Sequence, residues 1–273
     1  MVERSLGLGI SRSGARTNVL FRQLGDSEIF SNRTALVTGG GRGIGKAICE
    51  MLSLQGARVA VNYQRNEQAA RDTLSSLVGS ADQSMIVQAD VADPEQVDRM
   101  VVSVRDRLGP IDFLVNNAGI ASSVSHSDLT FADWKRMFAV NVDGTFLTTW
   151  AVKDEMIARR YGRIVNVSSL AGIKIKGRMI HYATTKAAVI SFTRHCAEVL
   201  APYDVRVNCV APGLTNTELA QSANPDLVQQ LISITPMGRI GEPAEIAGVV
   251  KFLLSDDASF VTGQTVPACG GRC

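Results

Sequence analysis

The stretch "TALVTGGGRGIG", residues 34–45, joins a short apolar run directly to a glycine-rich turn. Gly39, Gly43 and Gly45 follow the spacing G-x-x-x-G-x-G, and an apolar helical pattern begins at the second of them. Glycines allow a tight turn and a close approach of phosphate to the backbone, and the next helix presents its free N–H groups there. The stretch predicts a strand, a phosphate-binding turn and a helix, with a purely structural turn as the alternative.

The rest of the chain repeats this alternation of strand and helix. Strands are predicted at 34–38, 58–63, 84–89, 111–116, 162–169, 205–212 and near 264–268, with helical patterns such as 43–55, 66–77 and 94–107 between them. Each strand run is nearly continuous in apolar residues, which is typical of parallel strands covered on both faces. Asp93 should cap the third of these helices, with Pro94 in its first turn. We predict one α/β domain over residues 31–273: a doubly wound, Rossmann-type parallel sheet of about seven strands with helices on both faces.

The composition limits the class of protein. The 273 residues are 45% hydrophobic and 20% charged, which is enough for a sizeable core, and the formal net charge is +2. This balance gives no indication of a nucleic-acid partner, and the chain has no run of 18 apolar residues that would predict a membrane span. Residues 1–30 contain four arginines but no clear periodicity. We interpret them as a partly disordered extension, with organelle targeting as the alternative.

The cysteines and histidines do not form a metal-binding pattern. Three cysteines fall in apolar helix or strand patterns, and the last two are four residues apart with no histidine nearby: Cys49, Cys196, Cys209, Cys269 and Cys273. The three histidines also lack the spacing of metal ligands: His126, His181 and His195. We therefore expect no metal site, buried thiols at the first three cysteines, packing or surface roles for the histidines, and a reducing compartment, the cytoplasm.

Further motifs follow the predicted strands and occupy the helices between them. They are "DVAD" (90–93), "NNAG" (116–119), "NVDG" (141–144), "NVSS" (166–169), "YATTK" (182–186) and "APG" (211–213). Together with the glycine turn, and in this order and spacing, they resemble the short-chain dehydrogenase/reductase family from about residue 31 to the C-terminus. Within that family the chain is most similar to the β-ketoacyl-[acyl carrier protein] reductase branch, which "PMGRIGEPAEIA" (236–247) also resembles. The resemblance implies an NAD(P)-dependent oxidoreductase that acts on a ketone or a secondary alcohol.

The reduction of a carbonyl group needs a proton donor as well as a hydride donor. Tyr182 and Lys186 are four residues apart, so on a helix they share a face, and a nearby ammonium should lower the pKa of the tyrosine. The resemblance makes Tyr182 the proton donor, Lys186 the residue that holds the nicotinamide ribose, and Asn141 the holder of a relay water. It also implies a serine 13 residues before the tyrosine, which is Ser169 rather than Ser168. The Ser169 hydroxyl would polarise the substrate carbonyl, while its neighbour should face the other side of the strand.

The resemblance also implies the cofactor site. Its residues would be Gly39, Gly41, Arg42, Gly43, Ile44, Gly45, Gln64, Arg65, Asp90, Val91, Asn117, Ala118, Gly119, Tyr182, Lys186, Pro212, Gly213 and Thr215. Asp90 would contact the adenine amino group, residues 117–119 would line the adenosine and ribose, and residues 212–213 would border the nicotinamide. We interpret Asn116, in contrast, as a stabilising contact between central strands.

The stretch "VNYQRNE" (61–67) lacks the acid that commonly ends the second strand of a dinucleotide-binding fold. A carboxylate at Asn62, Tyr63 or Gln64 would bond a free ribose 2′-hydroxyl and repel a 2′-phosphate. Because no acid stands there, and because Arg42 and Arg65 can meet a phosphate, we predict NADP as cofactor. NADPH should bind more tightly than NADH by at least about tenfold, or roughly 1.4 kcal/mol. An exposed charge at a helix start is the alternative for Arg65.

The sequence leaves the substrate open. The branch resemblance favours a 3-oxoacyl thioester on acyl carrier protein, and hence a role in fatty acid biosynthesis. A steroid, sugar, polyketide or other secondary alcohol is the alternative, and a nucleotide-binding sensor or scaffold is the non-enzymatic one. The resemblance implies that residues 214–240 form a lid over the substrate. Cys269 stands where the branch usually has an aspartate before paired glycines, which bears on the substrate more than on the cofactor.

The sequence gives expectations for two kinds of partner, an acyl carrier protein and further copies of this chain. An acidic carrier protein would favour basic residues at the pocket mouth, and the candidates are Arg159, Arg160, Arg163, Lys174, Lys176 and Arg178. A solvated basic face is the alternative reading of these residues. Helical segments 133–160 and 182–200 are apolar enough to pair with copies of themselves. The resemblance therefore implies a homotetramer or a homodimer.

Overall fold

The sheet predicted from the sequence is present. The computed structural model describes residues 28–78, 83–174, 179–221 and 224–272. Within these residues a parallel sheet of seven strands has the order β3-β2-β1-β4-β5-β6-β7. The strands are β1 (Thr34–Val37), β2 (Arg58–Tyr63), β3 (Met85–Gln88), β4 (Phe113–Asn116), β5 (Gly162–Val167), β6 (Val205–Pro212) and β7 (Thr265–Ala268). All seven overlap their expected ranges, so the doubly wound fold is confirmed.

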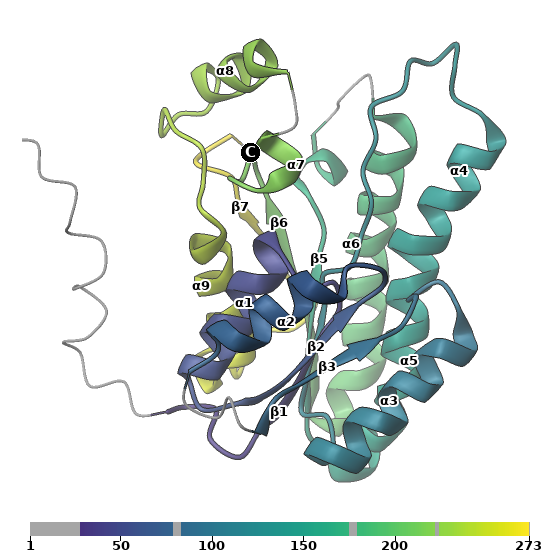
Figure 1. Cartoon of the computed structure of the whole chain (residues 1–273), viewed down its shortest axis with the longest axis vertical. Helices are drawn as coiled ribbons and strands as arrows, with labels where there is room; N and C mark the ends of the chain where they lie inside the picture. Colours follow the sequence, from purple (N-terminus) through teal and green to yellow (C-terminus); the bar gives the residue numbers. More distant parts are fainter. Residues whose placement is uncertain (1–27, 79–82, 175–178, 222–223, 273) are drawn as a thin grey trace, which may run out of the picture.

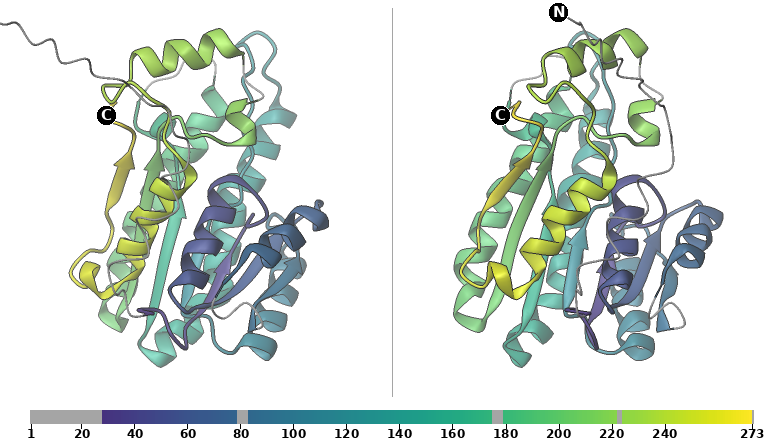
Figure 2. Two further views of the ribbon diagram at one scale, coloured as in Figure 1. Left: turned by 60° about the vertical axis from the view of Figure 1, so that its left-hand side comes forward. Right: turned by 90° about the vertical axis from the view of Figure 1, so that its left-hand side faces the viewer.

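Helices cover both faces of the sheet (Figure 1, Figure 2). One face carries α1 (Gly43–Leu54), α2 (Glu67–Ser76) and α9 (Pro243–Leu254), and the other carries α3 (Pro94–Leu108), α5 (Gly144–Arg159) and α6 (Ile180–Leu200). Strand β1 shows why two layers form, because Ala35 and Val37 pack with the first set of helices while Leu36 packs with the second. Successive strand side chains point to opposite faces, so a continuous apolar run must be covered twice.

The helix ends follow local capping rules. The Asp93 carboxylate accepts a hydrogen bond from the Gln96 backbone N–H at 3.1 Å, and Pro94 stands in the first turn of α3, as predicted. The long helix expected at 133–160 is instead divided in two. Helix α4 (Phe131–Phe138) passes through a π-helical turn at Ala139–Asp143 before α5 begins. Such turns occur often at functional sites.

The direction of winding reverses between β1 and β4, which are neighbours in the sheet although two strands separate them in sequence. The carboxyl ends of strands beside such a point diverge and leave a crevice where α/β proteins bind ligands. Helices α4, α7 (Glu218–Gln221) and α8 (Pro225–Ser233) extend beyond this edge of the sheet (Figure 1). The topology therefore indicates where a functional site should lie.

The segment before β1 is fixed to the core by Phe30. Its ring is 2% exposed and lies edge-on to Phe113, with 4.9 Å between ring centroids. Residues 1–27, most of the expected extension, lie outside the described residues. In the part of the chain that the structure describes, no helix combines the length and the apolar character needed to cross a membrane.

Candidate active site

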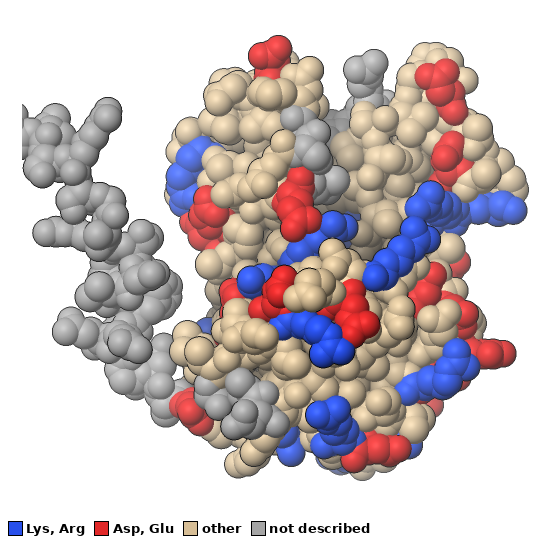
Figure 3. All heavy atoms as spheres, viewed as in Figure 1, with Lys and Arg blue, Asp and Glu red and all other residues tan. Residues whose placement is uncertain are grey.

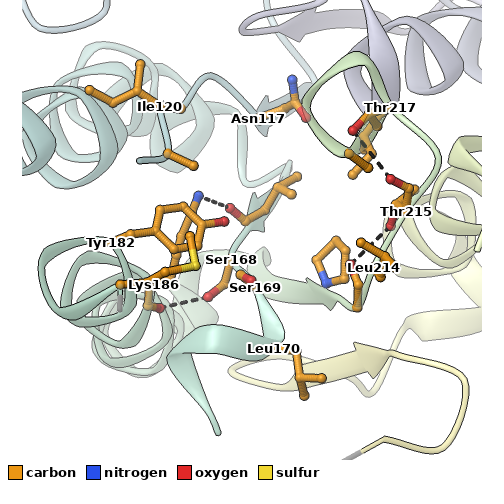
Figure 4. A pocket seen from close by; sticks show the side chains of 18 of the residues that line it. Asn117, Ile120, Ser168, Ser169, Leu170, Tyr182, Lys186, Leu214, Thr215 and Thr217 are labelled. Carbon is orange, nitrogen blue, oxygen red and sulfur yellow. Dashed lines mark hydrogen bonds between the residues drawn. The ribbon is translucent and has the colours of Figure 1, made fainter. Parts of the chain in front are cut away.

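A cavity of about 300 Å³ opens at the carboxyl edge of the sheet. Its wall includes many residues predicted for the site: Ile44, Asn117, Gly119, Ser169, Tyr182, Lys186, Pro212, Gly213 and Thr215. Figure 4 shows the side chains from α6 and the end of β5 on one side and those from the loop after β6 on the other. The apolar part of the wall includes Leu214, in the segment predicted as a lid, together with Ile120, Leu170 and Met179, which sequence reasoning did not assign.

Lys186 is held inside this wall. Its side chain is buried, and Nζ donates a hydrogen bond to the carbonyl oxygen of Val167 at 2.9 Å. Burial is the main cause that lowers the pKa of the Lys186 ammonium, to about 8. At neutral pH the ammonium is therefore still the major form, but it loses its proton far more readily than an exposed lysine does.

Tyr182 lies one helical turn before Lys186 and borders the cavity (Figure 4). Burial raises the pKa of its hydroxyl above the ordinary value, and a hydrogen bond with Ser169 opposes that rise. The expectation that the ammonium would lower this pKa is therefore wrong for this structure. Nζ of Lys186 lies 5.8 Å from the tyrosine ring centroid and makes its bond to Val167 instead, so loss of solvation dominates.

The two serines of "NVSS" have different surroundings. Ser168 is buried and donates its hydroxyl to the carbonyl oxygen of Lys186 at 2.7 Å, which ties β5 to α6. Ser169 is only partly buried and borders the cavity, and its hydroxyl oxygen accepts a bond from the Ala171 N–H at 3.1 Å. The geometry favours Ser169 as the serine that meets a substrate.

Asn141 sits in the π-helical turn and is 1% exposed. Its amide accepts a bond from the Ile120 N–H at 2.9 Å and donates to the Ile120 carbonyl and to the Thr185 hydroxyl, each at 3.0 Å. A Cβ built on Gly119 would lie 3.2 Å from Asn141 Oδ1 and 3.5 Å from Lys186 Nζ. Asn141 therefore lies close to the lysine and fixes the loop after β4 to the helix that carries it.

The glycine turn is built for close backbone contacts. Gly39 has φ +62° and Gly43 has φ +52°, and a Cβ on Gly45 would lie only 2.2 Å from the Gly39 carbonyl oxygen. Asn62 holds the turn from β2, because its buried side chain accepts a bond from the Gly39 N–H at 3.1 Å. Asn117 donates its amide to the carbonyls of Thr38 and Gly39. The sequence predicted Asn62 only as a position that lacks an acid. The sole signal for its contact with Gly39 is that a polar residue stands in an apolar strand.

Of the residues predicted for the adenosine end, Asn117 and Gly119 line the cavity, whereas Gln64, Arg65, Asp90 and Val91 do not. Gln64 donates its amide to the Asp90 carboxylate at 2.6 Å, and Arg65 is exposed beside it in sequence. Val91 is buried against Gly144, where an added Cβ would lie 2.8 Å from the valine side chain. Arg42 forms an ion pair with Glu218 of α7 at 3.0 Å. The basic residue predicted to meet a phosphate thus has a carboxylate partner in this structure.

Gly39, Gly41 and Asn116 make structural contacts. Gly41 lies against the backbone of Ala70, and Gly39 against that of Ala118. Asn116 donates to Asn166 at 2.9 Å across β4 and β5, which confirms its structural interpretation.

These features fit a dinucleotide. Helix α1 has no side-chain cap at its N-terminus, so the glycine turn presents backbone N–H groups without a competing side chain. The turn has no Cβ atoms where Gly39 and Gly45 meet, and none of the lining residues between this turn and Tyr182 is acidic.

The basic residues predicted for the pocket mouth are found in different places. Arg159, Arg160 and Arg163 are wrong as residues of the pocket mouth, because they flank the amino end of β5 and bond to Asp112, Pro202 and Asp204. Lys176 and Arg178 lie outside the described residues, whereas Lys174 is described and exposed.

The described cysteines and histidines largely have packing roles. Cys49, Cys196 and Cys209 are free and buried as expected, while Cys269 is disulfide-bonded. His181 is fully buried with its ring 2.7 Å from the Ser122 hydroxyl, and His195 bonds to the Ser191 carbonyl. Across the described ranges, no group of three His, Cys, Asp or Glu side chains could hold a metal ion.

Most of the chain matches a known family. Residues 39–272 match the family model described as Enoyl-(Acyl carrier protein) reductase. The chain belongs to the short-chain dehydrogenase/reductase family. It is 38% identical over 240 residues to a 3-oxoacyl-[acyl-carrier-protein] reductase of Synechocystis sp., covering 88% of this chain and 96% of that one.

Other members of this family carry different names. The chain is 39% identical over 241 residues to the (2S)-[(R)-hydroxy(phenyl)methyl]succinyl-CoA dehydrogenase subunit BbsD of Thauera aromatica, covering 88% and 96% of the two chains. The solved structure of levodione reductase superposes with a TM-score of 0.84 at 32% identity, over 89% of this chain and 98% of that one. This short-chain dehydrogenase/reductase is therefore an NAD(P)-dependent oxidoreductase.

Proposed function

We propose that this short-chain oxidoreductase uses NADPH to reduce a ketone to a secondary alcohol, with a 3-oxoacyl thioester as substrate. The observation that carries the proposal is that Tyr182, Ser169 and Lys186 meet at one cavity. The Tyr182 and Ser169 side chains both border this cavity, so a carbonyl oxygen beside them could accept a bond from both hydroxyls.

In the proposed reaction Tyr182 donates the proton. Because burial raises its pKa, the hydroxyl stays protonated at neutral pH and can donate to the carbonyl oxygen as negative charge develops there. Lys186 keeps its ammonium below a pH of about 8, and this cation would hold the nicotinamide ribose beside Tyr182. A bound nicotinamide cofactor would supply the hydride to the carbonyl carbon.

The other residues position these groups. Ser169 would orient and polarise the carbonyl, while Ser168 and Val167 bond to Lys186 and fix its backbone and ammonium respectively. Asn141 would take part in the proton relay through a water, since its side chain and the Lys186 ammonium both lie near Gly119.

The preference for NADPH is supported by charge. Between Asn62 and Asn66 the chain carries no acid, and Arg42 and Arg65 are the basic residues of the turn and of the loop after β2. A 2′-phosphate there would meet guanidinium groups rather than a carboxylate of β2. Gln64 and Asp90 would contribute to the adenosine end, with the glycine turn at the pyrophosphate and residues 212–215 at the nicotinamide.

The substrate assignment rests on two kinds of support. The curated relative from Synechocystis is named for 3-oxoacyl-[acyl carrier protein], and the cavity joins a polar end at Ser169 to an apolar wall. Levodione reductase and the Thauera enzyme carry other substrates in their names. A dehydrogenase for another secondary alcohol is therefore the second candidate.

A substitution of the proton donor tests the reaction. Tyr182→Phe should lower kcat for acetoacetyl thioesters and simple ketones by at least about 100-fold, because general acid catalysis contributes that much. NADPH oxidation, followed by absorbance, measures the effect, and Tyr203→Phe, at an exposed tyrosine after α6, is the matched control. Turnover by Tyr182→Phe at the wild-type rate would show the proposed mechanism to be wrong.

The proposed partners follow from the substrate. An acyl carrier protein would bring the thioester to the cavity mouth in fatty acid biosynthesis in the cytoplasm, and the enzyme would work as a homotetramer or homodimer. On the face seen in Figure 3, basic and acidic side chains are interspersed. This mixture gives no support to a nucleic-acid partner.

A further inference from the structure

The C-terminal turn forms part of the cavity wall. The edge strand β7 pairs with β6, and the Gly213 N–H donates to the Ala268 carbonyl at 2.8 Å. A Cβ on Gly213 would lie 2.9 Å from Cys269 Cα, so the strand end touches the loop that borders the proposed nicotinamide site. The departure from the family pattern at Cys269 therefore lies directly beside the site.

The residues after Cys269 contact the loop that contains Pro236 and Met237. The Met237 N–H donates to the Gly270 carbonyl at 3.1 Å, and a Cβ on Gly271 would lie 3.2 Å from the Pro236 ring. Arg272 follows, donates its backbone N–H to the Cys269 carbonyl at 3.3 Å, and lines the cavity. Its side chain is half-buried.

No ion pair balances the charge of Arg272 within the part of the chain that the structure describes. Among the described residues its guanidinium has no ion-pair partner, whereas Arg42 pairs with Glu218 and Arg239 pairs with Glu245. None of the lining residues of the cavity is Asp or Glu. The second cation of the wall, Lys186, already bonds to the Val167 carbonyl and belongs to the catalytic set. Among the described residues of this wall, Arg272 is therefore the cation that is available to a ligand.

We propose that Arg272 binds a carboxylate on the acyl part of the substrate, so that the enzyme prefers dicarboxylic 3-oxoacyl thioesters to those that end in a methyl group. An arginine fork matches the two oxygens of a carboxylate, and an apolar, acid-free wall strengthens that contact. Leu170, Met179 and Leu214 would hold the methylene groups between the ketone and the carboxylate. This inference rests on the proposed ketone reduction and specifies its substrate class.

Two thioesters of equal length test the inference. They are the N-acetylcysteamine thioesters of 3-oxohexanoic acid and of 3-oxohexanedioic acid carrying a free terminal carboxylate. Wild-type kcat/KM should be at least about tenfold higher for the second, since a charge-assisted contact of 1.4 kcal/mol or more corresponds to that ratio. Arg272→Ala should lower kcat/KM for the dicarboxylic thioester by about 10- to 100-fold and change the other by less than about twofold. For the dicarboxylic thioester, kcat/KM of Arg272→Lys should lie between the values of the wild type and of Arg272→Ala.

Three controls separate this role from others. Arg136→Ala, at an exposed arginine of α4, should leave both kcat/KM values unchanged. The NADPH dissociation constant of Arg272→Ala should equal that of the wild type, and a rise of about tenfold would assign Arg272 to a cofactor phosphate instead. If Arg272→Ala impairs coenzyme A thioesters but neither N-acetylcysteamine thioester, the anion is a phosphate of the carrier, and the inference is wrong.

Binding measured without turnover keeps the two proposals distinct. Calorimetric titration of both thioesters into wild type and Arg272→Ala, each saturated with NADP⁺, should reproduce the preference for the carboxylate. Preferential binding that depends on Arg272 but leads to no reduction would contradict the reaction and leave this inference standing. Equal binding of the two thioesters, with reduction of both, would contradict the inference alone.

Discussion

Ser168 and Ser169 are chemically identical neighbours with different contacts. Ser169→Ala should lower kcat/KM by about 100-fold, because it removes a donor to the developing oxyanion. Ser168→Ala should keep turnover within about threefold but lower the free energy of unfolding by about 1 kcal/mol, since it breaks a buried bond to the Lys186 carbonyl. Steady-state kinetics and urea unfolding of both variants measure the two effects. An inactive Ser168→Ala beside a normal Ser169→Ala would reverse the assignment.

At the scale of single residues, the sequence predicted which side chains line the cavity, but it did not predict how the cavity shifts their pKa values or which hydrogen bonds they make. Tyr182, Lys186 and Ser169 could be found because motif spacing is local. The direction of the Tyr182 pKa shift could not, because it depends on how many atoms from distant elements exclude water from the hydroxyl. Asn62 shows the same limit, since its role depends on the Gly39 N–H 23 positions earlier in the chain.

At the scale of elements, the ion pair between Arg42 and Glu218 joins the glycine turn to α7. The pair is exposed and hence worth less than about 1 kcal/mol, but a 2′-phosphate would have to compete with the carboxylate for the guanidinium. Arg42→Ala should raise the NADPH dissociation constant by about tenfold and leave that of NADH within about twofold. Glu218→Gln should lower the NADPH constant by up to about threefold. Fluorescence titration measures both constants.

A matched control for this prediction is Glu95→Gln, which breaks a comparable exposed pair with Arg99 on α3 and should change neither constant. If wild type binds NADH as tightly as NADPH, or if Arg42→Ala weakens both equally, the basic residues do not select the cofactor.

Element boundaries were predictable where the cause is local. Asp93 and Pro94 determine the start of α3, so that start was predicted correctly. The π-helical turn was not, because Asn141 is held inward by Ile120 and Thr185, which only the folded chain brings close. The basic residues at 159–163 were assigned to the wrong edge, although they lie just before β5 or at its start, and its direction already puts them at the amino end.

At the scale of the whole molecule, topology explains why one edge carries the site. All seven strands are parallel, so every carboxyl end lies on the same side, and the residues after β1, β4, β5 and β6 converge there. The alternation of strands and helices was sufficient to predict this arrangement. Arg272 was not predicted to line the cavity, because its position depends on how the chain turns after β7 pairs with β6.

The outer face of α5 and α6 carries an aromatic cluster that we expect to be covered by a second copy. Trp150 and Phe146 are 42% and 40% exposed and stack with ring centroids 4.4 Å apart, and the Phe192 ring lies 6.0 Å from Trp150. Two rings exposed together on adjacent turns indicate an interface more than isolated surface residues do. Trp150→Glu would place a charge there and should shift the protein to a smaller oligomer, measured by size-exclusion chromatography with light scattering. Val102→Glu, at a valine of α3 with 44% exposure, should leave the mass unchanged. A wild-type protein of monomeric mass, or an unchanged mass for Trp150→Glu, would contradict the expected homotetramer or homodimer through this face.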